Sequence, residues 1–172
     1  MISCDHYSHV ATLATNDMHH QALIDQYLAG IAAVEHAISG MSEEQFDARP
    51  VAGKWSTRQV VCHLADFEPV YADRMKRVIA ERCPTFFGGD PDIFAAGLSY
   101  DSRAVHTEVT LLAAVRRHMV PILRELSADD FQRVGNHSEA GSMTLESLLR
   151  NIADHVPHHV HFIAEKRRAL GI

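Results

Sequence analysis

The stretch that decides the fold lies near the end of the chain, where residues 144–170 read TLESLLRNIADHVPHHVHFIAEKRRAL. Its apolar residues recur at steps of three and four positions, which predicts a single apolar face along an amphipathic helix. These residues are Leu145, Leu148, Leu149, Ile152, Val156, Val160 and Ile163. Because such a helix is stable only when other elements cover its apolar face, the segment predicts a helical bundle.

Two histidines, His155 and His159, lie on or beside this apolar face. Four residues of helix correspond to ~400° of rotation and ~6 Å of rise, so the two imidazoles are neighbours and could share a metal ion. The spacing alone is weak support, since a chain with 13 histidines is expected to contain such a pair by chance. At this point hydrogen-bonded core histidines and metal ligands both remain open.

Three earlier segments show the same helical periodicity. The first spans residues 17–39, the second begins at Ser56, and the third spans residues 102–126. Ser56 followed by Gln59 is a capping box, which marks the start of the second helix. The expected fold is therefore all-α, a four-helix bundle with long connections at residues 84–100 and 127–143.

The weakly periodic residues 1–16 are expected to form a poorly ordered N-terminal arm, and residues 17–172 a single domain. Cys4, His6 and His9 in this arm could bind metal adventitiously. In the last segment, Thr144 is the expected N-cap and Gly171 the expected stop. Lys166, Arg167 and Arg168 are interpreted as a basic helix end, where cations interact favourably with the last carbonyls.

Composition excludes several classes of protein. The formal net charge is −6 and the basic residues are scattered, which argues against nucleic-acid binding. No apolar run is long enough for a membrane span and no export signal is evident, so a soluble cytoplasmic protein is expected. The three cysteines are odd in number and widely spaced, which predicts reduced thiols.

A third histidine, His63, falls within the apolar face of the second helix. Together, His63, His155 and His159 could converge from two helices in the bundle core. Three neutral imidazoles would leave a metal ion at least one open coordination position, which is the catalytic rather than the structural pattern. A hydrogen-bonded core histidine is the alternative for His63.

The chain resembles the DinB/YfiT-like (DinB superfamily) metalloproteins in two groups of residues. The first is Gly53-Lys54-Trp55-Ser56 followed by His63-Leu64-Ala65-Asp66, and the second is residues 141–146, GSMTLE, leading into His155 and His159. The resemblance covers roughly residues 20–170. It carries the three-histidine metal site of the family onto His63, His155 and His159.

This resemblance also implies an up-down-down-up topology, with a crossover at residues 84–100, and a homodimer as an expected assembly. Family members with assigned activity use low-molecular-weight thiols in transferase or isomerase reactions, and many others are described only as metal-dependent hydrolases. The expected cofactor is a divalent metal, zinc or nickel first and iron or manganese as alternatives, together with a low-molecular-weight thiol and a small-molecule substrate.

One departure from the family pattern concerns the residues that follow His155. Relatives often place polar residues there, including an aspartate, whereas this chain has Val156 and Pro157. Asp66 or Asp154 could orient a ligand histidine instead.

Three functions follow from the sequence: a metal-dependent thiol transferase, a hydrolase that activates water, and a metal- or ligand-binding bundle without turnover.

Overall fold

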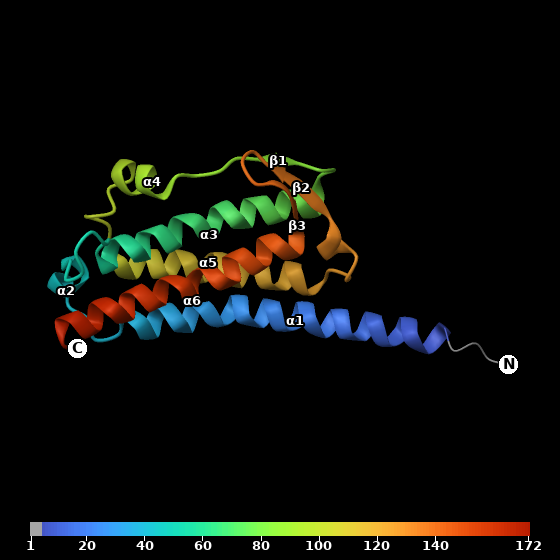
Figure 1. The fold of residues 1–172 in the computed structure, drawn as a ribbon, viewed down its shortest axis with the longest axis horizontal. Coiled ribbons are helices and arrows are strands. Elements are labelled where there is room, and N and C mark those ends of the chain that lie inside the picture. The colour runs from blue at the N-terminus through green and yellow to red at the C-terminus, as the bar shows by residue number, and fades with distance from the viewer. Residues whose placement is uncertain (1–4) are drawn as a thin grey trace.

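The computed structural model describes the backbone of residues 5–172 and the side chains of residues 18–172. Four long helices form a bundle (Figure 1), namely α1 (Asp5–Ile38), α3 (Thr57–Ala80), α5 (Val105–Arg124) and α6 (Leu145–Leu170). Helices α1 and α6 run in one direction and α3 and α5 in the other. The predicted four-helix bundle with up-down-down-up topology is therefore confirmed. In the described part of the chain, no helix has the length and apolar character that a membrane crossing requires.

The predicted helix ends are present. The Ser56 side chain accepts a hydrogen bond from the Gln59 backbone N–H at 3.2 Å, and the Ser56 backbone N–H donates to Gln59 Oε1 at 2.9 Å. Thr144 caps α6 by accepting from the Ser147 N–H at 3.1 Å. Gly171 ends the same helix in the left-handed conformation, at φ 75°. These contacts satisfy backbone groups that have no partner within the helix.

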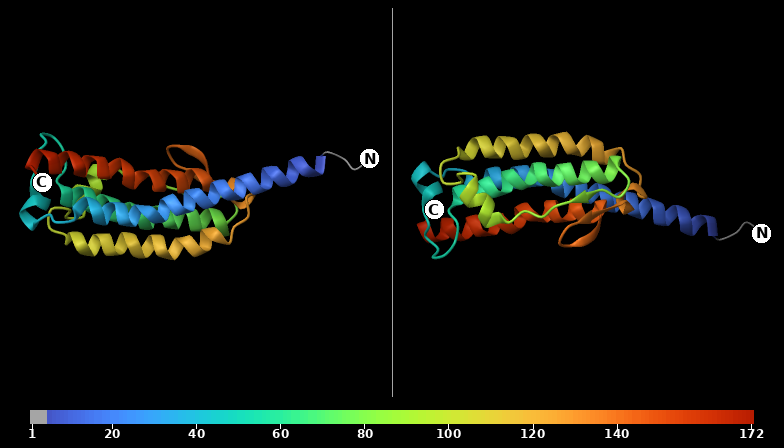
Figure 2. Two further views of the ribbon diagram at one scale, coloured as in Figure 1. Left: turned by 90° about the horizontal axis from the view of Figure 1, so that it is seen from below. Right: turned by 90° about the horizontal axis from the view of Figure 1, so that it is seen from above.

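Helix α1 begins at Asp5, before the position predicted from periodicity. Its N-terminal part projects beyond the other three long helices (Figure 2). A helical segment that covers no neighbour needs no apolar face, so periodicity gave no signal there. Residues 1–4 and the side chains of His6 and His9 lie outside the described part.

Both long connections contain short elements that the sequence did not reveal. The first holds β1 (Thr85–Phe86) and α4 (Pro91–Gly97), and the second holds the 3-10 turn η1 (Asp130–Gln132), β2 (Val134–His137) and β3 (Gly141–Thr144). Strand β2 pairs in parallel with β1 and antiparallel with β3. Strands of two to four residues are too short for an alternating pattern to be recognised. A further short helix, α2 (Glu43–Asp47), joins α1 to α3.

The apolar face predicted for α6 is buried in the core, where six of its members are fully enclosed. These six are Leu145, Leu148, Leu149, Ile152, Val156 and Ile163.

The buried guanidinium of Arg116 links all four long helices. Arg116 of α5 donates to the Glu68 carboxylate of α3, the Tyr27 carbonyl of α1 and the Ile152 carbonyl of α6.

Candidate metal centre

The structure brings together the three histidines singled out in the sequence. His63 comes from the N-terminal half of α3, and His155 and His159 come from successive turns of α6. One ring nitrogen from each imidazole can be chosen so that all three atoms lie within 4.8 Å of one another. It is the one such cluster of potential metal ligands within the described residues.

The imidazole rings face one another at close range. The Nε2 atoms of His63 and His155 are 2.9 Å apart. The three ring centroids are separated by 4.7 to 4.8 Å. Pro157 lies between the two histidines of α6, but the helix continues through it and keeps both rings on the side that faces α3.

The surroundings of the cluster favour neutral imidazoles. Burial lowers the pKa of His63 to about 4, although the nearby Asp66 carboxylate partly offsets the effect. Burial and the neighbouring histidines lower the pKa of His155 to about 2 and that of His159 to about 3. Neutral imidazoles keep the nitrogen lone pair that a metal ion requires.

The cluster contains buried nitrogens without hydrogen-bond partners among the described residues. These are the Nδ1 atoms of His63, His155 and His159. A buried polar atom of this kind is costly unless it finds a partner of its own. Three converging neutral imidazoles form a donor set that suits a borderline divalent ion, so the residues fit a metal site.

Neither aspartate considered as an orienting partner contacts a histidine of the cluster. Both carboxylate oxygens of Asp66 accept hydrogen bonds from Arg103, at 2.8 and 2.9 Å. Asp154 is exposed and accepts from Gln26 at 2.6 Å. Asp66 therefore acts on His63 only through its charge.

Aromatic rings surround the cluster. Trp55 and Phe67 pack against His63, with ring centroids 5.3 and 4.6 Å away, and Phe162 lies 5.8 Å from His159. Phe94 of α4 packs on Phe67 at 5.4 Å, so the first long connection places an aromatic residue near the histidines. These rings give the cluster an apolar surround, while His155 and His159 remain partly exposed.

A small pocket of about 200 Å³ opens beside His159, and we call it the lysine pocket. Seven residues line it: Gly53, Lys54, Trp55, Val60, His159, Phe162 and Lys166. The sequence interpretation placed Lys166 with Arg167 and Arg168 at a basic helix end, but Lys166 is only 2% exposed. The sequence did contain a signal for this burial, because Lys166 follows His159 by seven residues and so lies on nearly the same face of the helix.

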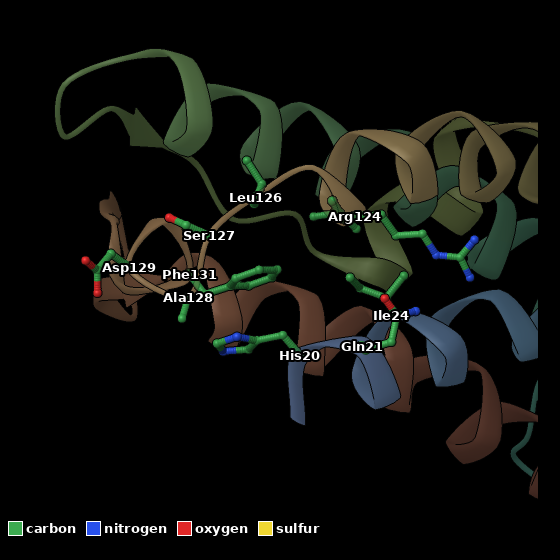
Figure 3. A pocket seen from close by; sticks show the side chains of 10 residues that line it. His20, Gln21, Ile24, Arg124, Leu126, Ser127, Ala128, Asp129 and Phe131 are labelled. Atoms are coloured by element: carbon green, nitrogen blue, oxygen red, sulfur yellow. The ribbon is translucent and has the colours of Figure 1, made fainter. Parts of the chain in front are cut away.

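A second pocket lies elsewhere in the molecule and shares no residue with the histidine cluster. It is formed by α1, the end of α5 and the segment that follows (Figure 3). His20 stacks there on Phe131, with ring centroids 4.0 Å apart, and its Nε2 lies 3.4 Å from Glu146. Arg124 forms an ion pair with Asp25. Because these charged groups are paired, this pocket offers less for a charged ligand than the lysine pocket does.

Several other histidines and cysteines of the described residues lie apart from this cluster. His106, His118, His158 and His161 are exposed and lie outside the cluster. Cys62 is buried and Cys83 is exposed, and both are free thiols. Cys4 lies outside the described part of the chain.

Known proteins similar in sequence to this chain are named as metal-dependent hydrolases. A protein named "Putative metal-dependent hydrolase" from Oceanobacillus iheyensis is 28% identical over 127 residues, which cover 74% of this chain and 73% of the relative. Another protein so named, from Bacillus cereus strain G9842, is 27% identical over 155 residues, covering 88% of this chain and 89% of the relative.

A solved structure is also similar. It is YfiT from Bacillus subtilis, described as a probable metal-dependent hydrolase with an unusual four-helix bundle topology. The two chains superpose with a TM-score of 0.83 at 26% identity, over 88% of this chain and 87% of YfiT. The sequence profile of the DinB superfamily matches residues 26–163. The chain belongs to the DinB superfamily.

Proposed function

We propose that this protein is a metal-dependent enzyme in which His63, His155 and His159 bind one divalent ion next to a small-molecule site. The observation that carries the proposal is the convergence of three imidazoles, one buried and two partly buried, with no carboxylate among them. Such a ligand set leaves the ion its full positive charge and an open position. When bound, the ion would lower the pKa of a thiol or of water that occupies this position.

For the reaction, we propose transfer of a low-molecular-weight thiol to an electrophilic small molecule. A free thiol has a pKa of about 8.5, far below that of water, so it needs less help in losing its proton. This matters because Asp66, the carboxylate that acts on His63, has both oxygens bonded to Arg103, which makes it a poor general base. The aromatic rings of Trp55, Phe67 and Phe162 offer an apolar surface for an electrophile.

Hydrolysis is the second candidate, and the names of the relatives favour it. In that case the same three imidazoles would hold the ion. Zinc or nickel suits three imidazoles best, while iron and manganese are alternatives.

A paired assay separates the two reactions. Protein loaded with zinc, nickel, iron or manganese is mixed with bacillithiol, mycothiol, glutathione or coenzyme A and an epoxide or chlorinated aromatic. The same preparation is tested on simple esters and amides. We expect conjugate formation that His159→Ala abolishes and His158→Ala preserves. If no conjugate forms and the protein instead hydrolyses esters or amides, with activity lost in His159→Ala and kept in His158→Ala, thiol transfer is rejected in favour of hydrolysis. Inactivity in both assays would reject both reactions.

A further inference from the structure

The lysine pocket contains a buried ammonium that forms no ion pair with the described residues, although the charge of Glu165 partly offsets its burial. Lys166 is 2% exposed, and its ammonium donates to the Phe162 carbonyl at 3.2 Å. An ammonium carries three N–H donors, and this is its one hydrogen bond to the described residues. Two donors are therefore available to a ligand.

The nearest acidic residue along the helix does not pair with this ammonium. Glu165 Oε1 lies 3.2 Å from His161 Nε2 instead. Burying an unpaired charge is costly, and burial accordingly lowers the pKa of Lys166. A lysine that only covered apolar surface would extend its ammonium into water, which this one does not do.

A second lysine approaches the same pocket from the loop that precedes α3. Lys54 is exposed, and its Nζ lies 6.0 Å from the centroid of the Phe162 ring. The chain has three lysines, of which two line this pocket and the third, Lys76, is exposed on α3. The pocket thus combines two cations with the apolar rings of Trp55 and Phe162.

We propose that the lysine pocket binds the anionic group, a carboxylate or a phosphate, of a small organic ligand whose other end reaches the three-histidine centre. Lys166 supplies the buried charge and Lys54 closes the pocket from the solvent side. His159 and Lys166 are seven residues apart, so they differ by ~20° around the helix and ~10 Å along it. The ligand therefore carries its anionic group several bonds from the atom that reaches the histidines. Only the statement that the ligand reaches the three-histidine centre rests on the proposed function.

Binding can be tested without any enzymatic activity, because the single tryptophan, Trp55, lines the pocket. Metal-free and zinc-loaded protein are titrated with hexanoate, hexyl phosphate and neutral hexanamide, and Trp55 fluorescence and calorimetry are recorded. We expect at least one of the two anions to bind ~10-fold more tightly than hexanamide. The preference should weaken as salt is raised, since it is electrostatic.

Matched variants then locate the binding site. Lys166→Met should remove the preference for the anion, Lys54→Met should reduce it, and Lys76→Met should leave it unchanged. Lys166→Gln provides a polar alternative if the methionine variant is poorly folded by circular dichroism. Equal binding of the anions and hexanamide, or an unchanged preference in a folded Lys166 variant, would overturn the proposal. Failure of the proposed reaction would leave this result intact, because no turnover is measured.

Discussion

The guanidinium of Arg116 and the carboxylate of Glu68 form a completely enclosed ion pair, in which both side chains are 0% exposed. Tyr27 adds a hydrogen bond to the second oxygen of Glu68 at 3.1 Å. Arg116 also donates to the carbonyls of Tyr27 and Ile152, so the pair links all four long helices. Glu68 follows His63 by five residues of α3, and Ile152 precedes His155 by three residues of α6, so the pair also holds together the two helices that carry the histidines.

Replacing one partner of this pair should be severely destabilising. Arg116→Met leaves the Glu68 carboxylate buried without its cation, and we expect a loss of about 3–5 kcal/mol in the free energy of unfolding. Urea unfolding followed by circular dichroism measures the loss. The control is Arg124→Met, because Arg124 pairs with Asp25 at the surface and should contribute less than about 1 kcal/mol. A loss of similar size in both variants would contradict this account.

Gly30 provides a separate test of the same region. A Cβ atom at this position would overlap Arg116 Nη1, which donates to the Tyr27 carbonyl. Gly30→Ala should therefore destabilise the protein by about 1–3 kcal/mol, although alanine favours helix more than glycine does. Gly97→Ala is the matched control, since a Cβ there meets no atom within 4 Å. Thermal denaturation of both variants decides the matter, and an equal or raised melting temperature for Gly30→Ala would count against the packing described.

Metal binding should depend on each of the three clustered histidines. We expect about one divalent ion per chain in tag-free protein, and a higher melting temperature with metal than after chelation. His63→Ala, His155→Ala and His159→Ala should each abolish tight binding, measured by elemental analysis after dialysis. His158→Ala should retain it, because that side chain is exposed and outside the cluster. Undiminished stoichiometric binding by His63→Ala would show that the ligand set is different.

Stability at low pH should depend on Glu146. Partial burial works to raise the pKa of its carboxyl group, but hydrogen bonds from Arg150, His19 and His20 outweigh burial and lower that pKa to about 2. A carboxyl whose pKa is lower in the folded than in the unfolded state contributes stability above the unfolded pKa of about 4.5, and this is lost as pH falls toward 2.

The measurement is the melting temperature of Glu146→Gln and of the parent protein between pH 7 and pH 2. The variant should be less stable above pH 4.5, and the difference should shrink as the pH falls. Glu35→Gln, at an exposed position of α1, serves as the control. A difference that stays constant over this range would exclude the ionised carboxylate as its source.

Lys166→Met should leave the free energy of unfolding unchanged or raise it by up to about 1 kcal/mol, because an unpaired buried charge is removed. The melting temperature should accordingly stay the same or rise. A lysine needed for the fold would give the opposite result. Differential scanning calorimetry without added ligand makes the measurement, with Lys76→Met for comparison. Marked destabilisation by Lys166→Met alone would argue that the ammonium serves the helix end rather than a ligand.

The assembly of the protein stays a prediction. The family resemblance suggests a homodimer, and light scattering of the purified protein would test it across a range of concentrations. A monomer at all concentrations would remove that expectation without affecting the histidine cluster, since all three histidines come from one chain.

The sequence by itself determined the four helices and their inward faces. The steps of three and four in α6, the capping box at Ser56 and the left-handed Gly171 are local features, set by helix geometry and backbone hydrogen bonding. The histidines were found for the same reason, because His63, His155 and His159 sit on faces that had to be buried. Their order and spacing also carried the family resemblance.

Only the tertiary structure decided which groups meet across the bundle. Arg116 and Glu68 are 48 residues apart, and nothing local marks them as partners. Lys166 looked like one cation of a basic helix end until the loop with Lys54 and Trp55 was placed over it. The short strands and the early start of α1 were missed because neither leaves a periodic apolar pattern. Periodicity reports which face of an element is buried, whereas the partners of a buried charge depend on how separate elements pack together.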